Sequence, residues 1–412
     1  MIPRERMKAF LAGGRVDRIP CAMGACETEG LHNLAYHRLK QVLGIDDPTN
    51  RVVTFMFNAS FQLPVVNAME GDCVLLGSRM CPSRLWGPGS EADWKDLDIW
   101  DITIQVPNDW SFRQDPDGAY WFNESSKCPP GGLYFDAPAG SGVASAFDGA
   151  DQPSPKDFAP PRELPEPMLR RLAEQAQWLH ENTDYCIFCG EVISDLQLTP
   201  GGMQAWWMQM VEEPDACHEF LGKAVDAALA QLKQLDEAVG PYCDVLGIGH
   251  DMGDTRGVTI GPDLWREIYK PHYKRLFTEW HHITKMKVNL HTCGSVVDIL
   301  DDLIECGVDI INPVQTSARG MSPDALVERF GERVTFFGGA FDAVLLPKET
   351  PADVVYEQVK RNIKTLNRHG RYLFSGVHNL PGDTPQEHLA AMLAAYRDCR
   401  PQREGSSRKE ET

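Results

Sequence analysis

The feature that most constrains the fold is an alternation of short apolar segments with longer segments of helical periodicity. Eight segments have the composition and length of buried strands: 16–24, 71–77, 184–191, 243–251, 287–294, 308–315, 334–339 and 371–379. Nearly all of them precede a stretch in which apolar residues recur every three or four positions, as in an amphipathic helix. Strands that alternate with helices pair in parallel through right-handed crossovers. Eight such units predict an α/β fold, namely a closed (β/α)₈ TIM barrel.

An open, doubly wound sheet is the alternative to a barrel. Its dinucleotide-binding form needs a glycine-rich G-x-G-x-x-G turn after the first strand, and the sequence has no such turn there. The barrel is therefore the favoured fold. The helices are predicted at 3–12, 31–43, 50–70, 168–182, 202–211, 213–239, 262–282, 296–306, 322–330, 351–368 and 384–398.

A long insertion interrupts the alternation after the second strand. Residues 78–165 are rich in proline, glycine, tryptophan and aspartate. Within them, the turn sequence Asp-Pro-Asp-Gly at 115–118 separates two aromatic stretches, which predicts a β-hairpin. We predict a single barrel domain over residues 1–400, with the insertion near the barrel mouth, and a disordered polar tail over 401–412.

Charge and composition exclude several classes of partner. The 412 residues include 59 acidic and 40 basic side chains, which gives a formal net charge of -19. Such a chain lacks the basic footprint needed for binding nucleic acid or an anionic membrane surface. No apolar run approaches the roughly 18 residues of a membrane span, and the N-terminus has no signal-peptide pattern. The sequence thus predicts a soluble, cytoplasmic protein whose twelve cysteines are reduced thiols or metal ligands.

Polar side chains gather where the predicted strands end, which is where the active site of a (β/α)₈ barrel lies. They are Glu191, His250, Asp251, His291, Cys293, Asn312, Gln315, His378 and Asn379. His291 and Cys293 lie two residues apart and so share one face of their strand. Imidazole nitrogen and thiolate sulfur are zinc ligands, and a catalytic zinc has three protein ligands. The third ligand is left open among His378, Glu191, Cys189 and Asp251. The alternative is a hydrogen-bonded core histidine beside a small buried cysteine.

Several of these stretches match a known family. They are 248–257 (IGHDMGDTRG), 261–271 (GPDLWREIYKP), 291–294 (HTCG), 307–315 (GVDIINPVQ) and 336–339 (FFGG). The chain resembles the uroporphyrinogen decarboxylase superfamily, and within it the cobalamin-dependent methyltransferase branch, from about residue 165 to 398. The resemblance implies a (β/α)₈ barrel. The decarboxylase itself holds its acidic substrate with arginines after the first strand. The sequence CAMGACETEG at 21–30 has none, which argues against porphyrinogen decarboxylation.

The methyltransferase branch implies a zinc site made of a His-x-Cys pair and a later cysteine on the last strand. His291 and Cys293 match the pair, whereas the segment 375–378 (SGVH) contains no cysteine. We therefore predict His378 as the third ligand. The departure from the thiol-methylating pattern favours O-demethylation of a small substrate such as an aromatic methyl ether.

The resemblance also implies partners and roles. The methyl group would move between a small methylated substrate and a corrinoid protein that carries cobalamin. Asp251, His250, Glu191, Asn312 and Gln315 are predicted to be catalytic because they stand at strand ends. A second hypothesis is a metal-free decarboxylase or lyase in which Asp251 and His250 act as acid–base groups. Candidates for lining a substrate pocket are four aromatic residues of the insertion, Trp100, Trp110, Tyr120 and Trp121, and the pair Trp206 and Trp207.

Overall fold

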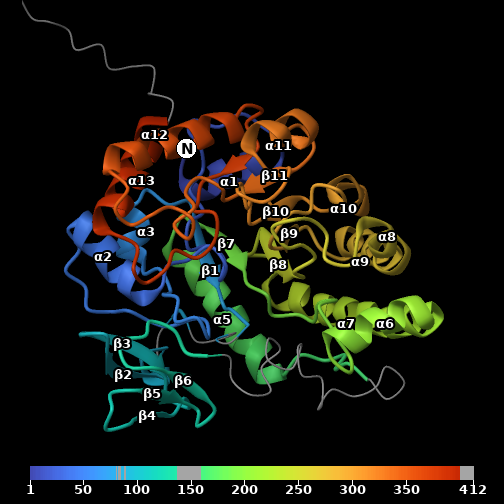
Figure 1. Cartoon of the computed structure of the whole chain (residues 1–412), viewed down its shortest axis with the longest axis horizontal. Coiled ribbons are helices and arrows are strands. Elements are labelled where there is room, and N and C mark those ends of the chain that lie inside the picture. Colours follow the sequence, from blue (N-terminus) through green and yellow to red (C-terminus); the bar gives the residue numbers. More distant parts are fainter. Residues whose placement is uncertain (80, 82–84, 88–89, 137–158, 400–412) are drawn as a thin grey trace, which may run out of the picture.

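The structure is a computed structural model that describes residues 1–79, 81, 85–87, 90–136 and 159–399 (Figure 1). The predicted disordered tail at 401–412 lies outside the described residues, and so does part of the insertion, residues 137–158. None of the helices in the described ranges is both long and apolar enough to cross a membrane.

A curled sheet of parallel strands forms the centre of the molecule. Seven strands follow one another in the order β1, β7, β8, β9, β10, β11, β12, and every neighbouring pair is parallel. Their bounds are Cys73–Leu76, Cys186–Cys189, Val245–Gly249, Lys287–His291, Ile310–Asn312, Thr335–Phe337 and Tyr372–Leu373. Each strand lies within a segment that the sequence predicted as a strand. The predicted α/β barrel-type fold is confirmed.

The predicted first strand is reduced to a single bridge, but it occupies the eighth position of the ring. Cys21 is paired in parallel with Phe374, and the N–H of Phe374 donates to the carbonyl of Pro20 at 2.9 Å. On the other side, the N–H of Asp72 donates to the carbonyl of Cys21 at 2.8 Å. The segment is short because Pro20 has no N–H to donate and Gly24 turns the chain with a φ of 77°.

Helices surround the sheet, as a strand–helix alternation requires (Figure 1). They are α1 Pro3–Leu11, α2 Asn33–Leu43, α3 Leu63–Ala68, α5 Glu166–Asn182, α6 Met203–Glu212, α7 Pro214–Val239, α8 Pro262–Ile268, α9 Lys270–Ile283, α10 Leu300–Cys306, α11 Pro323–Phe330, α12 Ala352–Leu366 and α13 Gln386–Cys399. The helix predicted over 50–70 is wrong except for α3. There, Val52 pairs with Ala59 across a turn at Phe57, and Arg51 pairs with Gln105 of the insertion.

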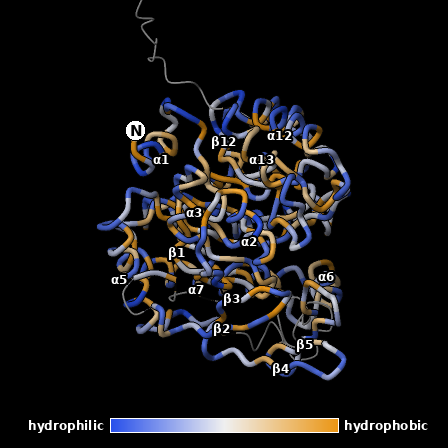
Figure 2. The backbone as a smooth tube through the Cα atoms, turned by 90° about the vertical axis from the view of Figure 1, so that its left-hand side faces the viewer, coloured by the Kyte–Doolittle hydropathy of each residue, from blue (hydrophilic) through white to orange (hydrophobic). Residues whose placement is uncertain are grey.

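Side chains of alternate strand residues fill two separate cores. Residues such as Leu246, Ile248 and Leu290 face outward and pack with the surrounding helices. Residues such as Val245 and Phe337 face the barrel interior, where a second apolar cluster also includes Met7 and Phe10 of α1. Figure 2 shows hydrophilic residues along the outer edges and hydrophobic residues among the elements inside. The direction in which a strand residue points therefore follows from its position relative to these two cores.

The insertion forms two small antiparallel sheets on one side of the barrel (Figure 1). A short 3₁₀-helix, η1 Ser90–Asp93, precedes β2 Trp94–Ile99, which pairs with β3 Ile102–Pro107; β4 Phe112–Gln114, β5 Tyr120–Phe122 and β6 Ser126–Cys128 form the second sheet. The predicted hairpin is confirmed, because β4 and β5 pair across the 115–118 turn. Phe57, Trp110 and Phe122 pack together in a separate apolar cluster beneath these sheets.

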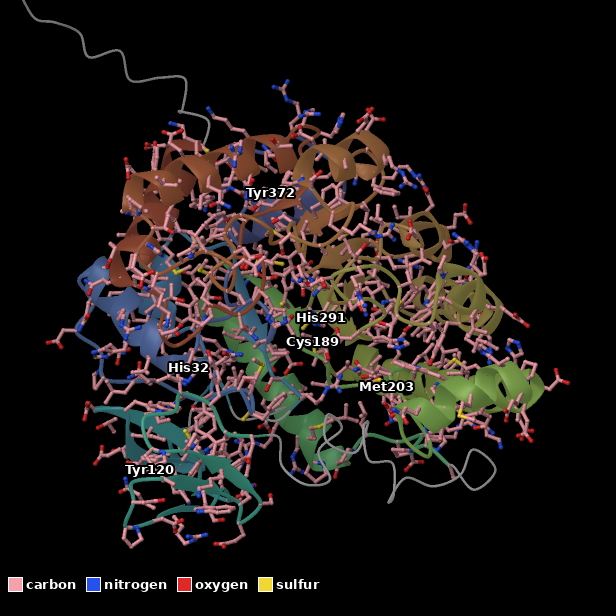
Figure 3. The ribbon with its side chains drawn as sticks, viewed as in Figure 1. His32, Tyr120, Cys189, Met203, His291 and Tyr372 are labelled. Carbon is pink, nitrogen blue, oxygen red and sulfur yellow. The ribbon has the colours of Figure 1, made fainter. Side chains whose placement is uncertain are left out.

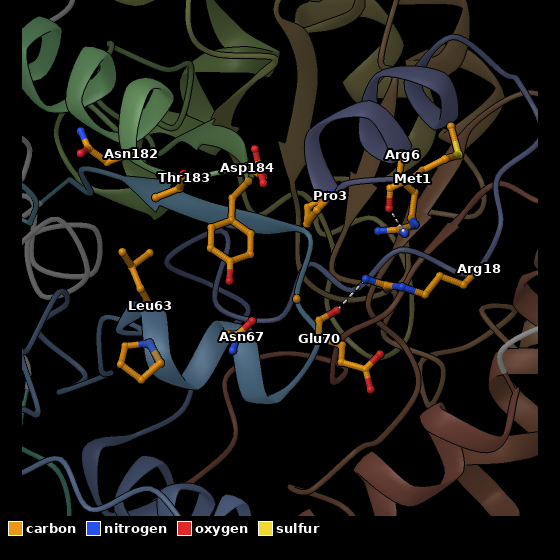
Figure 4. Close-up of a pocket in the computed structure, with 13 residues that line it drawn as sticks. Met1, Pro3, Arg6, Arg18, Leu63, Asn67, Glu70, Asn182, Thr183 and Asp184 are labelled. Carbon is orange, nitrogen blue, oxygen red and sulfur yellow. Dashed lines mark hydrogen bonds between the residues drawn. The ribbon is translucent and has the colours of Figure 1, made fainter.

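The closing seam of the barrel is held by a buried carboxylate at the amino ends of the strands. Asp72 is fully buried, and its Oδ2 accepts the N–H of Cys21 at 2.8 Å. Its two oxygens also accept from Arg6 Nη1 at 2.5 Å and Arg18 Nη1 at 2.7 Å. A cavity of about 660 Å³ adjoins these arginines (Figure 4), where Arg18 also donates to the carbonyl of Glu70 at 2.9 Å. This cavity lies at the end of the barrel opposite to the predicted active site.

Candidate metal centre

Three predicted metal ligands lie together at the carboxyl ends of the strands. His291 is the last residue of β9, Cys293 follows it in the next loop, and His378 lies beyond β12. Their ligand atoms all lie within 4.8 Å of one another. The rings of His291 and His378 face each other edge to face, with centroids 5.4 Å apart. Figure 3 shows His291 near the middle of the ring of strands.

The spacing of these donor atoms fits a tetrahedral zinc ion. With zinc–sulfur and zinc–nitrogen bonds of about 2.3 and 2.1 Å, two ligands at the tetrahedral angle are about 3.6 Å apart. Cys293 Sγ and His291 Nε2 are 3.5 Å apart. His291 is 8% exposed and the other two residues are half-buried, so one side of the group remains accessible. Two imidazoles and one thiol supply three protein donors, which is the number that a catalytic zinc site uses while it keeps one position open.

The protonation preferences of the group suit metal binding. Burial, and to a smaller extent the neighbouring His291, lowers the pKa of His378 to about 3, so its imidazole is neutral at physiological pH. Burial and the nearby Asp251 carboxylate raise the pKa of the Cys293 thiol well above its usual value. The thiol therefore remains protonated unless a cation is present to stabilise the thiolate.

Asn312 and Gln315, both predicted to be catalytic, hold the ligand strand in place. Asn312 lies beside His291 on the neighbouring strand β10, and its Oδ1 is 2.9 Å from His291 Nδ1. This contact fixes the plane of the His291 ring through Nδ1, and Nε2 is the ring nitrogen on the side of Cys293 Sγ. Gln315 Oε1 accepts the N–H of Gly294 at 2.8 Å, which fixes the loop that carries Cys293. The two residues thus fix the ring of His291 and the loop of Cys293, which are two of the predicted ligands.

Asp251 lies at the edge of the ligand group. Its Oδ1 accepts the N–H of Cys293 at 3.0 Å and lies 3.6 Å from His291 Nε2. Burial raises the pKa of this carboxyl, but His291 and the Cys293 N–H outweigh burial and hold the pKa below its usual value. A half-exposed carboxylate thus stands beside the accessible side of the three ligands.

Glu191 lies across strand β8, on the inner face of the barrel. A Cβ atom at Gly249 would be 2.8 Å from both of its carboxylate oxygens, so only glycine leaves room for this side chain. Arg79 Nη2 donates to Glu191 at 2.6 Å and to Asp195 at 2.7 Å. The Glu191 carboxylate is therefore paired with the guanidinium of Arg79. Its side chain packs against the glycines of β8.

His250 does not join the site, which corrects the prediction that it acts with Asp251. Its Nδ1 lies 2.7 Å from the hydroxyl of Tyr273, and its ring packs edge-on against Tyr269 with centroids 4.9 Å apart. His250 thus points outward into the helix layer, as do Ile248 and Leu246, two and four residues earlier. Burial lowers the pKa of His250 to about 4. Its ring lies in the helix layer, outside the group formed by His291, Cys293 and His378.

Cys189, which the sequence left open as a ligand, also points away from the site. It is buried in the outer core between the sheet and the helices. Glu191 is two residues further along and would point the same way if the strand continued. Strand β7 ends at Cys189, however, so the side chains of Cys189 and Glu191 point in different directions.

Residues after the first strand contribute contacts that the sequence did not reveal. Glu29 Oε1 accepts from Asn312 Nδ2 at 2.7 Å, and Thr28 Oγ1 donates to Asn312 Oδ1 at 2.9 Å. Glu27 accepts the backbone N–H groups of Arg79 at 2.9 Å and Glu191 at 3.3 Å. Burial and the Glu191 charge raise the pKa of Glu27 to about 8. Glu27 and Glu29 follow the predicted strand 16–24 closely, and this position could have indicated that their side chains contact residues at the strand ends.

The aromatic residues proposed as pocket walls mainly pack the insertion. Trp110 lies in the cluster with Phe57, and the Trp121 ring is contacted by the guanidinium of Arg113 at 4.9 Å. Trp100 packs on His32 of the barrel, with ring centroids 4.6 Å apart. Trp100 and Tyr120 also line a cavity of about 690 Å³ between α2 and the insertion. Their contacts place these rings within the insertion or beside α2. Trp206 lies in the outer core, where its Nε1 donates to the hydroxyl of Tyr269 at 2.9 Å.

The chain was compared with known protein families and solved structures. Residues 198–399 match the sequence model of the family described as uroporphyrinogen decarboxylase (URO-D). This stretch, just under half of the chain, is therefore similar to that family. The whole chain is similar in fold to a solved methyltransferase from Methanosarcina mazei, with a TM-score of 0.56 and 16% sequence identity over 97% of this chain and 99% of that chain. A search of curated proteins found no match.

Proposed function

We propose that this protein is a zinc-dependent methyltransferase that moves a methyl group between a small substrate and the cobalamin of a corrinoid protein. The observation that carries the proposal is the group formed by His291, Cys293 and His378, whose ligand atoms lie within 4.8 Å of one another. The similarity in fold to a methyltransferase supports it.

The residues of the site divide into those that would hold the metal and those that position them. His291, Cys293 and His378 would bind zinc and leave its fourth position to the substrate. Bound there, zinc supplies a Lewis acid that polarises a substrate oxygen or keeps a substrate thiol deprotonated. Asn312 fixes the ring of His291, and Asp251 holds the backbone of Cys293. These contacts keep the donor atoms in place before substrate arrives.

The substrate class that we propose is an aromatic methyl ether, which the enzyme would demethylate at oxygen. The support is the third ligand, since the thiol-methylating pattern has a cysteine near residues 375–378, where this chain has no cysteine and offers His378. Two imidazoles and one thiolate carry less negative charge than one imidazole and two thiolates. Zinc is therefore the stronger Lewis acid here, which suits activation of a neutral ether oxygen.

Metal analysis of the purified protein tests the metal site. We expect close to one zinc per chain in the wild type and a large loss of zinc in Cys293→Ser and His378→Ala. Matched controls are Cys399→Ser and His37→Ala, which alter a cysteine and a histidine outside the ligand group and are expected to keep their zinc. Unchanged zinc content in Cys293→Ser would overturn the proposed site.

A methyl-transfer assay tests the reaction. Cobalamin reduced to the cobalt(I) state serves as the acceptor, and its conversion to methylcobalamin is followed by absorbance with methoxylated aromatic acids, methanol, methylamines or methyl thioethers as donors. We expect methylation from the methoxylated aromatics, with activity lost in Cys293→Ser. Transfer from another donor alone would refute the substrate class, and no transfer from any donor by zinc-loaded protein would refute the proposed reaction.

A further inference from the structure

A chain of buried hydrogen bonds runs from His291 to the loop after the first strand. Asn312 is fully buried, so each polar atom of its amide needs a partner. Its Oδ1 accepts from His291 Nδ1 and from Thr28 Oγ1, both at 2.9 Å, and its Nδ2 donates to Glu29 Oε1 at 2.7 Å. In this orientation of the amide, both lone pairs of its oxygen and one N–H of its Nδ2 have buried partners.

The backbone holds Asn312 just as firmly. Asn312 and His291 are register partners on the adjacent parallel strands β10 and β9, so their side chains project from neighbouring points of the same face. The N–H of Thr292 donates to the carbonyl of Asn312 at 2.6 Å, which extends the ladder past the end of β9. Neither side chain can rotate away without breaking buried hydrogen bonds.

Glu29 has its own close support. It is 1% exposed, and a Cβ atom at Gly338 would be 2.7 Å from Glu29 Oε1. Gly338 also has a φ of 94°, which L-residues rarely adopt. The glycine leaves the space that the Glu29 carboxyl fills, so the far end of the chain of contacts is fixed by packing as well as by hydrogen bonding.

We propose that Asn312 and Glu29 are positioning residues that select the tautomer of His291, with the proton on Nδ1, and so present Nε2 to the metal. Partners of this kind set ring orientation and ligand basicity in other metal sites. This inference rests on the proposed zinc function for its purpose, but the tautomer itself is a property of the metal-free protein.

The test has two readouts on the full-length chain. Nitrogen NMR of protein labelled in its histidines, with His291→Gln to assign the signal, reports which ring nitrogen of His291 is protonated in the absence of metal. Cobalt(II) titration, followed by the visible absorption of the bound ion, reports affinity and ligand geometry. Four variants are compared with the wild type: Asn312→Ala, Asn312→Asp, Glu29→Gln and Asn362→Ala. The last alters another buried asparagine, which donates to the backbone of Gly339 and Ala340.

We expect a protonated Nδ1 in the wild type, and we expect Asn312→Asp to retain it because a carboxylate still accepts from Nδ1. Asn312→Ala should give a mixture of tautomers and weaken cobalt binding by roughly 10- to 100-fold. Glu29→Gln should weaken binding less, whereas Asn362→Ala should change stability alone. A wild-type His291 protonated on Nε2, or a tautomer and cobalt affinity unchanged in Asn312→Ala, would overturn the inference. Absence of cobalt binding in the wild type with the expected tautomers would instead refute the zinc proposal alone.

Discussion

The carboxylate of Asp72 offers the sharpest test of how the barrel is closed. The Asp72 side chain is 0% exposed. The side chains of its two partners, Arg6 and Arg18, are 5% and 14% exposed. Replacing Asp72 by alanine leaves Arg18 buried without a carboxylate partner, whereas Arg6 keeps its contact with Asp17 at 2.6 Å. It also removes the acceptor for the N–H of Cys21.

The expected magnitude follows from that burial. Removing one partner of a buried ion pair costs about 3–5 kcal/mol, because the remaining charge is left without compensation. The matched control is Asp301→Ala, since Asp301 also contacts two arginines, Arg329 and Arg333, but all three side chains are 43–52% exposed. Exposed pairs contribute about 1 kcal/mol or less. The two substitutions are the same in chemistry and differ in burial.

Urea unfolding followed by circular dichroism measures both losses. We expect the free energy of unfolding to fall by at least about 2 kcal/mol more for Asp72→Ala than for Asp301→Ala. Adding Arg18→Met to Asp72→Ala should recover part of the loss, because it removes the unpaired cation. Equal losses for the two alanine variants, or no recovery in the double variant, would refute the reasoning that the seam depends on a compensated buried charge.

Three further predictions concern stability elsewhere in the barrel. Gly190→Ala places a Cβ atom 2.4 Å from the carbonyl oxygen of Gly77. We therefore expect the free energy of unfolding, measured in urea, to fall by about 1–3 kcal/mol. Gly222 lies within α7, and a Cβ atom added there would have no other atom within 4 Å. Gly222→Ala should therefore raise the free energy of unfolding by about 0.5–1 kcal/mol, as measured by thermal unfolding. The hydrogen bond to Asp309 raises the pKa of His281, so the stabilisation by this pair is complete below the unfolded pKa and is lost as pH rises through the folded value. His281→Gln should therefore destabilise more at about pH 5.5 than at about pH 9, by well under 1 kcal/mol because the ring is a third exposed; equal losses at the two pH values would contradict this.

Most of the fold was predictable because the strands are short, apolar and separated by helices of clear periodicity. The exceptions have physical causes. Residues 51–59 pair with one another and with the insertion, so their structure depends on a partner distant in sequence. The first strand is shortened by Pro20 and by the turn at Gly24. Neither effect appears in the local hydrophobic pattern, which reports burial rather than pairing.

The site was predictable where strand geometry determines it. His291, Cys293 and His378 lie together, as a shared site requires, and zinc binding stays a prediction. His250 was misplaced although its alternation with Leu246 and Ile248 already indicated the helix-facing side. Glu29 was missed because its partner, Asn312, is remote in the chain. Contacts between distant loops need the closed barrel before they can be recognised.

The pairing of Cys21 with Phe374 has a consequence for how the chain is made. A ribosome synthesises the segment at Cys21 long before the segment at Phe374. Until Phe374 has emerged, the segment at Cys21 lacks its neighbour on one edge, and exposed strand edges pair readily with other chains. The ring can close only after the last strand has emerged, so the final contact is also the one with the longest loop to close.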